Sequence, residues 1–219
     1  MISLWNDAEA AKFTTLLEQR VYTSRLLGRD TSLVLHGGGN TSVKARERNI
    51  FGEEEDILWV KGSGSDLETI APAGFSPCRL AHLLRLAKLP ALSDTQMADE
   101  LRGCMTNPAA PSPSVEAILH ALLPHTFVDH THTDALISIT NTPSGEQRVR
   151  EIYGNSVVVI PYVMPGFKLA RLCAEHFPQQ AHASTRGLVL LSHGLFTFGP
   201  TARASYEAMI ELVTLAENN

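Results

Sequence analysis

The stretch Thr126-Phe127-Val128-Asp129-His130-Thr131-His132 places two histidines at the end of a run that favours a β-strand. Residues i and i+2 of a strand project to the same side of the sheet. The imidazoles of His130 and His132 are therefore expected on one face, where they can share a metal ion. A third candidate ligand, His193, follows the apolar run 188–191. Three neutral imidazoles around an open fourth position are typical of catalytic zinc, although nitrogen ligands alone also suit other divalent ions.

The composition indicates one globular domain over residues 1–219, because a chain of 219 residues with 44% hydrophobic side chains can bury a good core. The net charge of −5, without a lysine or arginine cluster, argues against a nucleic acid or an anionic membrane as partner. The odd set of three cysteines predicts no disulfide framework. No signal peptide or membrane-spanning run is apparent, so we expect a cytoplasmic protein.

Two glycine-rich loops follow strand-like runs. The first, His36-Gly37-Gly38-Gly39-Asn40-Thr41-Ser42, separates the apolar residues 33–35 from Val43. Its backbone amides and polar side chains can meet an anion, although a flexible hairpin turn explains it equally well. The second, Lys61-Gly62-Ser63-Gly64-Ser65-Asp66, comes directly after the predicted strand 57–60. Its spacing is not that of a Walker loop, but two such loops favour convergence on one anionic group.

The segment Pro113-Ser114-Val115-Glu116 opens a predicted helix that runs to Leu123, with Ser114 as its N-cap. Glu116 lies in the first turn, on the same helical face as His120 four residues later. Two interpretations are open for Glu116. It can be a carboxylate placed to stabilise the helix dipole, or it can be a functional group.

Apolar periodicity and turn residues predict the remaining elements. The last predicted helix, from Thr201 to Glu217, is apolar on more than one stripe and should be buried or pack on a partner. The other predicted helices cover residues 6–28, 77–88, 94–105, 134–139, 144–153 and 167–176, and the other predicted strands cover 157–160, 188–191 and 196–199.

Taken in order, these motifs resemble those of the class II aldolase/adducin family. Members carry Gly-Asn-x-Ser, Thr-x-Ser/Thr-Gly, Pro-Ser-Ser-Glu, His-x-His and His-Gly, and the resemblance spans roughly residues 6–217. It implies an α/β fold with a central, mainly antiparallel mixed sheet flanked by helices, and a homotetramer with sites between subunits. It also implies a zinc-dependent aldolase that reversibly cleaves a ketose 1-phosphate, of the L-rhamnulose or L-fuculose type, into dihydroxyacetone phosphate and an aldehyde.

The resemblance assigns a role to each matching residue. Glu116 would be the catalytic acid/base. The phosphate of the sugar substrate would be held by Asn40, Ser63, Gly64 and Ser114. The zinc ion would be bound by His130, His132 and His193.

Two positions depart from the family pattern. Val115 replaces the second serine of the phosphate motif, and Lys61 stands where the aldolases commonly carry threonine. The first change removes a hydroxyl donor and the second adds a cation, so a carboxylate substrate remains open beside a phosphate. The long segment 64–114 looks like the aldolase part of bifunctional rhamnulose-1-phosphate aldolase/alcohol dehydrogenase proteins, and the chain is either a stand-alone relative or a partial chain.

The family also offers other functions. The same fold and metal site serve sugar-phosphate epimerases, a dehydratase and decarboxylases, and adducin has a metal-free binding role in the cytoskeleton. Since all three histidines and Glu116 are present, the sequence favours an enzyme over an adducin-like protein.

Overall fold

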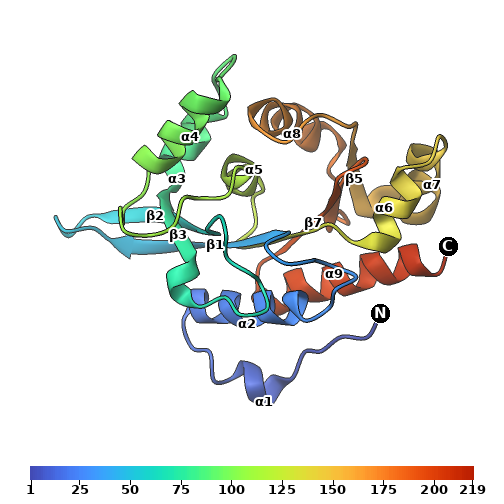
Figure 1. The fold of residues 1–219 in the computed structure, drawn as a ribbon, viewed down its shortest axis with the longest axis horizontal. Coiled ribbons are helices and arrows are strands. Elements are labelled where there is room, and N and C mark those ends of the chain that lie inside the picture. The colour runs from blue at the N-terminus through green and yellow to red at the C-terminus, as the bar shows by residue number, and fades with distance from the viewer.

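A seven-stranded sheet runs through the middle of the computed structural model, which describes residues 1–219 (Figure 1). The strand order is β3-β2-β1-β4-β7-β6-β5, and every neighbouring pair is antiparallel except β5 and β6, which are parallel. The strands are β1 (Asn40–Arg48), β2 (Glu54–Lys61), β3 (Phe75–Arg79), β4 (Phe127–Thr131), β5 (Val157–Ile160), β6 (Gly187–Leu190) and β7 (Gly194–Gly199).

Helices cover both faces of this sheet (Figure 1). One face carries α2 (Leu16–Gly28) and α9 (Ala202–Glu217), and the other carries α3 (Leu80–Leu86), α4 (Asp94–Gly103), α5 (Ala117–Leu122) and α8 (Phe167–Gln180). The short α1 (Asp7–Ala10) lies outside α2. Helices α6 (Asp134–Thr140) and α7 (Gly145–Tyr153) lie beside α9, near the β5 end of the sheet, and pack in the same apolar cluster as α2 and α9. Two 3-10 turns, η1 (Pro72–Gly74) and η2 (Gly154–Ser156), complete the elements. The predicted α/β fold, with a central and mainly antiparallel sheet flanked by helices, is confirmed.

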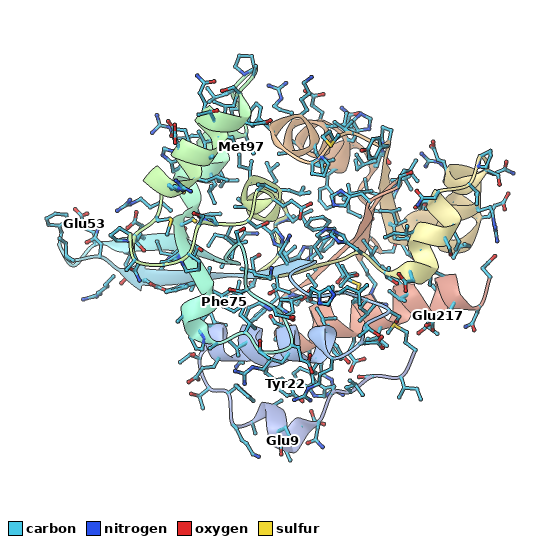
Figure 2. All side chains as sticks on the ribbon, viewed as in Figure 1. Glu9, Tyr22, Glu53, Phe75, Met97 and Glu217 are labelled. Carbon is cyan, nitrogen blue, oxygen red and sulfur yellow. The ribbon has the colours of Figure 1, made fainter.

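The sheet separates two apolar layers, and side chains fill the space on either side of it (Figure 2). Strand β5 shows why its sequence is apolar throughout. Val157 and Val159 pack into the cluster that includes α2 and α9, whereas Val158 and Ile160 pack into the cluster that includes α5 and α8. A strand that is buried on both faces needs a continuous apolar run rather than an alternating one.

Strand β4 is central, between β1 and β7, and the residues on its two faces contact different helices. Asp129 contacts Arg20 of α2, and Thr131 contacts Met209 of α9. Val128 packs on the opposite side, in the cluster that contains residues of α5 and α8. His130 therefore projects toward α5, as the two-residue periodicity predicts.

One predicted helix proves to be two. Residues 6–28 were expected to form a continuous helix, but α1 ends at Ala10 and α2 begins at Leu16. Thr15 accepts a hydrogen bond from the backbone N–H of Glu18, whose side chain accepts one from the backbone N–H of Thr15. This capping box starts a new helix in a sequence whose apolar spacing continues across the break.

Two further element predictions are wrong. Residues 33–35 do not form a strand: Leu33 ends a turn, and Val34 and Leu35 have no regular secondary structure. Asp30 accepts hydrogen bonds from the backbone N–H groups of Ser32 and Leu33, which holds this turn. The predicted helix 77–88 begins instead as the edge strand β3, and only α3 is helical. Pro77 is tolerated in β3 because the outer side of this edge strand pairs with no other strand and makes only isolated backbone hydrogen bonds to residues 104–106.

Other expectations hold. Cys78, Cys104 and Cys173 are free and buried, in agreement with the absence of a disulfide framework. The predicted helix 94–105 and the helices and strands after residue 126 are present, with their ends displaced by a few residues at most. None of the helices combines the length and the apolar character needed to cross a lipid bilayer.

Candidate metal centre

Three histidines from two parts of the chain come together beside α5. His130 is in β4, His132 follows that strand, and His193 lies in the turn between β6 and β7. Ring nitrogens of the three lie within 4.8 Å of one another, and the Nε2 atoms of His130 and His132 are 3.0 Å apart. Nitrogen ligands at 2.0–2.1 Å from a tetrahedral zinc ion lie roughly 3.3 Å apart. The donor set and its spacing therefore fit a divalent metal ion held by three imidazoles.

Hydrogen bonding prepares His130 for this role. Its Nδ1 lies 3.1 Å from the carbonyl oxygen of Leu195, which can only accept, so Nδ1 carries the proton. Burial lowers the pKa of His130 well below its ordinary value, so the ring is neutral and its Nε2 has a free lone pair. The ring also stacks on Phe196, with 4.0 Å between the ring centroids. A carbonyl partner that fixes the tautomer of a metal-binding histidine is a common outer-shell contact.

The turn that carries His193 is tightly constrained. Ser192 has a φ of 55°, a conformation that non-glycine residues seldom adopt. A Cβ atom on Gly194 would lie 2.3 Å from the carbonyl oxygen of Thr131 and 3.0 Å from Cε1 of His130. Only glycine fits at position 194, so the glycine that follows His193 is required because any side chain would clash. Backbone strain of this kind is concentrated at functional sites.

Glu116 faces the histidines. Its Oε1 is 3.3 Å from Nε2 of His193, its Oε2 is 3.4 Å from Nε2 of His130, and its Oε2 accepts a hydrogen bond of 2.6 Å from Nδ2 of Asn40. The side chain is 6% exposed. Burial raises the pKa of Glu116 to about 7, while the hydrogen bond from Asn40 and the charge of Lys61 act in the opposite direction.

The contacts of the Glu116 side chain differ from those of a helix-capping residue. Helix α5 begins at Ala117, and the Glu116 side chain makes no capping hydrogen bond. The prediction that Ser114 caps this helix is also wrong, because Ser114 to Glu116 form a turn in which Ser114 Oγ accepts from the backbone N–H of Glu116 at 3.2 Å. Glu116 is therefore directed away from its own helix and into the histidine cluster.

The two glycine-rich loops and the segment before α5 line one cavity of about 290 Å³. The predicted phosphate-binding residues all border it: Asn40, Ser63, Gly64 and Ser114. Glu116, His132 and His193 border it as well, while His130 lies fully buried behind them. Glycine is needed at position 39 for this convergence, because Gly39 has a φ of 63° and a Cβ there would lie 2.7 Å from the carbonyl oxygen of His130.

Lys61 also borders the cavity, and the sequence did not include it among the expected binding residues. It is 3% exposed, and its Nζ donates a hydrogen bond of 2.9 Å to the carbonyl oxygen of Gly37. An ammonium group has three donors, so donors remain for a ligand. The sequence signal was the lysine at the end of a buried strand, directly before a glycine and serine loop.

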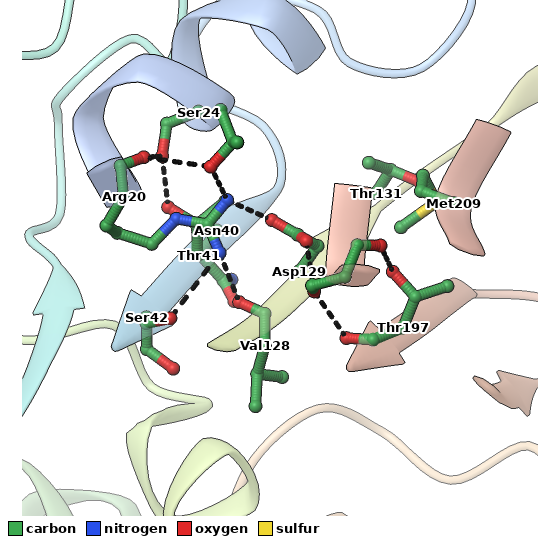
Figure 3. A network of polar contacts seen from close by, with 12 residues as sticks. Arg20, Ser24, Asn40, Thr41, Ser42, Val128, Asp129, Thr131, Thr197 and Met209 are labelled. Atoms are coloured by element: carbon green, nitrogen blue, oxygen red, sulfur yellow. Dashed lines mark hydrogen bonds and ion pairs between the residues drawn. The ribbon is translucent and has the colours of Figure 1, made fainter. Parts of the chain in front are cut away.

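The opposite face of β4 is fixed by a buried ion pair (Figure 3). Arg20 contacts the carboxylate of Asp129 and also donates to the carbonyl oxygens of Ser42 and Val128, at 3.4 and 3.3 Å. Ser205 of α9 donates to the other carboxylate oxygen of Asp129. Because Asp129 directly precedes His130, this network fixes the strand that carries the histidine. Losing one partner of a buried ion pair typically costs about 3–5 kcal/mol.

The buried histidines make a prediction about acid stability. Burial lowers the pKa values of His120, His130 and His132, and lowers that of His193 to about 4, from an ordinary value of 6.5. Below pH 6.5 the unfolded chain therefore binds protons that the folded chain does not. These groups contribute stability that is present above pH 6.5 and is lost as the pH falls.

Glu116 acts in the opposite sense, because its raised pKa favours the folded state at low pH and this contribution is lost as the pH rises from about 4.5 to about 7. The four histidines together change the free energy of unfolding with pH more than the single carboxyl group of Glu116 does. Metal-free protein should therefore unfold at a lower temperature or urea concentration at about pH 5 than at about pH 7. An unchanged or higher midpoint at the lower pH would contradict the buried, neutral state of these rings.

Fold and site together define a mixed α/β domain with a three-histidine group that could hold a metal. The chain belongs to the class II aldolase/adducin family, since the family described as "Class II Aldolase and Adducin N-terminal domain" matches residues 18–219. This confirms the resemblance drawn from the five motifs.

Individual relatives support the same assignment. The N-terminal class II aldolase domain of a conserved protein from Thermoplasma acidophilum is 45% identical, with a TM-score of 0.91 over 100% of this chain and 98% of that one. An L-fuculose-1-phosphate aldolase from Thermus thermophilus has the same fold at 19% identity, with a TM-score of 0.56 over 91% of this chain and 93% of that one.

A curated relative is much longer. The chain is 42% identical over 215 residues to a Bacillus subtilis protein named "Uncharacterized oxidoreductase YuxG", covering 98% of this chain and 31% of the relative. The chain thus spans about a third of the length of the curated relative that it matches.

Proposed function

We propose that this domain is a metal-dependent aldolase that reversibly cleaves a ketose 1-phosphate, of the L-rhamnulose or L-fuculose type, into dihydroxyacetone phosphate and an aldehyde. The observation that carries the proposal is the position of Glu116, a buried carboxylate 3.3 and 3.4 Å from two of three clustered imidazoles. Family membership supports the aldolase class of reaction.

His130, His132 and His193 would hold the ion, with zinc the preferred identity for three nitrogen ligands. A bound divalent ion supplies Lewis-acid stabilisation of the negative charge that develops on the substrate oxygens. Imidazole ligands also bind other divalent transition-metal ions.

Glu116 would transfer the proton. In the cleavage direction the bond between C3 and C4 breaks, the C4 hydroxyl loses its proton to become the aldehyde, and the electron pair passes to the fragment that contains C3. Protonation of C3 then gives dihydroxyacetone phosphate. A pKa of about 7 makes both the acid and the carboxylate form of Glu116 available near neutral pH, which suits a group that works in both directions.

The phosphate would lie between the loops. Asn40, Ser63, Gly64 and Ser114 border the same cavity as Glu116, so an anion held by them would place the adjoining carbon atoms near the histidines. Lys61 adds a buried cation at this border, which supports an anionic substrate group. A phosphate is the better occupant because several donors from two loops suit its several oxygens.

The test is release of dihydroxyacetone phosphate from purified protein given L-rhamnulose 1-phosphate or L-fuculose 1-phosphate, measured with a coupled reductase. Release from either sugar supports the aldolase and selects the substrate. Isomerised sugar phosphate without release would indicate an epimerase, and loss of carbon dioxide from a sugar acid would indicate a decarboxylase. A protein that binds no metal and turns over none of these would favour an adducin-like binding role.

Replacing Lys61 by methionine should raise KM for the sugar phosphate by about 10- to 100-fold, because a hydrogen bond to a charged group contributes about 1.5–3 kcal/mol. The turnover number should change much less, since Lys61 borders the anion end of the cavity. Lys88→Met, at an exposed position after α3, is the matched control. An unchanged KM for Lys61→Met would remove this lysine from the binding site.

We further propose that the protein acts in the cytoplasm as a homotetramer, as the family resemblance implies. Analytical ultracentrifugation of the purified protein tests the assembly. A monomeric species at micromolar concentration would contradict it.

A further inference from the structure

A chain of hydrogen bonds runs from strand β1 through α5 to Glu116. Ser42 Oγ lies 2.8 Å from Nδ1 of His120, Nε2 of His120 contacts Oδ1 of Asn40, and Nδ2 of Asn40 donates to Oε2 of Glu116 at 2.6 Å. His120 and Ser42 have no exposed surface, and Asn40 is 7% exposed. Each member of the chain therefore depends on the others rather than on water.

The donors in this chain can be assigned by elimination. A carboxylate only accepts, so the amide nitrogen of Asn40 must face Glu116 and its oxygen must face His120. The amide oxygen also only accepts, so Nε2 of His120 carries the proton. Nδ1 of a neutral imidazole then accepts, and the Ser42 hydroxyl donates to it. His120 is neutral because burial lowers its pKa well below its ordinary value.

The arrangement has a consequence for the carboxylate. One oxygen of Glu116, Oε2, accepts a hydrogen bond from Asn40. The other oxygen, Oε1, is buried and makes no hydrogen bond, and Nε2 of His193 lies 3.3 Å from it. An unpartnered buried carboxylate oxygen is unfavourable unless a ligand or a proton engages it. Oε1 is thus the oxygen that is left free to act.

We propose that His120 is a positioning residue, which holds the amide of Asn40 so that it fixes Oε2 of Glu116 and leaves Oε1 for proton transfer. This inference rests on the proposed function for the identity of the transferred proton. The hydrogen-bond chain itself does not depend on the reaction.

Two substitutions of His120 test the contacts of its two ring nitrogens separately. The amide of glutamine reaches about as far as Nε2, so His120→Gln keeps a donor to Asn40. The amide of asparagine reaches only as far as Nδ1, so His120→Asn keeps the contact with Ser42 and loses the one with Asn40. Loss of an outer-shell partner typically costs about 10- to 100-fold in activity.

We expect His120→Asn to lower kcat by about 10- to 100-fold with KM and metal content near those of the unmodified protein. His120→Gln should recover most of that loss. A merely structural role would affect both variants alike, or would change metal content and unfolding temperature together with kcat. Equal activity of the two variants would overturn the proposal.

A second measurement does not require turnover. Long-range proton–nitrogen NMR of the unmodified protein reports which ring nitrogen of His120 carries the proton, and the side-chain amide signals of Asn40 report its restraint. We expect the Nε2–H tautomer and a slowly exchanging Asn40 amide, which should exchange faster in His120→Asn. The Nδ1–H tautomer would overturn the proposal. Absence of aldolase activity in all proteins, with the expected NMR result, would overturn the proposed function and leave the positioning contact standing.

Discussion

Replacing Glu116 by glutamine is expected to lower kcat by about 10³-fold while the protein keeps its metal, because general acid–base catalysis contributes about 10²–10⁴-fold. The amide has nearly the shape of the carboxylate, so the fold and the approach to Asn40 are retained. It cannot exchange a proton with carbon in the relevant pH range. The measurement is the release of dihydroxyacetone phosphate together with the metal content of the same sample.

Glu146→Gln is the matched control, since Glu146 is an exposed residue of α7 that pairs with Arg150. It should retain the activity of the unmodified protein. Near-normal turnover by Glu116→Gln would exclude Glu116 as the proton-transfer group. Loss of metal from Glu116→Gln would instead mean that the carboxylate belongs to the metal-binding set.

Replacing His193 by alanine should weaken zinc binding by more than about 100-fold, because even outer-shell partners of a metal contribute about 10- to 100-fold. Two ring nitrogens, His130 Nε2 and His132 Nε2, would remain 3.0 Å apart, but the third donor would be gone. Competition with a chromogenic chelator measures the affinity directly, without reference to any substrate.

His182→Ala is the control here, because His182 is exposed in the segment before β6 and lies outside the histidine cluster. It should bind zinc as the unmodified protein does. Unchanged zinc affinity in His193→Ala would show that the three histidines do not act as one site. Unfolding temperatures of both variants, measured without metal, separate lost ligation from lost structure.

Much of the fold follows from local patterns, and the failures have identifiable causes. Strand β4 was predicted from β-favouring residues, and their alternation predicted that the rings of His130 and His132 lie on one side, as they do. The break between α1 and α2 was missed because apolar spacing continues across a capping box. The strand β3 was missed because its residues precede a helix without a turn, so only pairing with β2 reveals it.

The candidate site also has a part that the sequence predicted and a part that only the folded structure reveals. The histidines, Glu116 and the two loops were singled out from local patterns, and the order of the motifs then gave the family resemblance. Nothing in local sequence measures how closely these residues converge. The role of His120 was hidden because its partners Asn40 and Ser42 are about 80 positions away in the chain. Its helical spacing from Glu116 gave the only signal, and that spacing fits a scaffold residue equally well.

The most direct measurement is the dependence of aldol cleavage on metal. Protein freed of metal by a chelator and then dialysed should release no dihydroxyacetone phosphate from L-rhamnulose 1-phosphate or L-fuculose 1-phosphate. Added zinc should restore release in proportion to the zinc bound, with saturation at one ion per site. Full release by the metal-free protein, or no release from either sugar by protein saturated with zinc, would contradict the account.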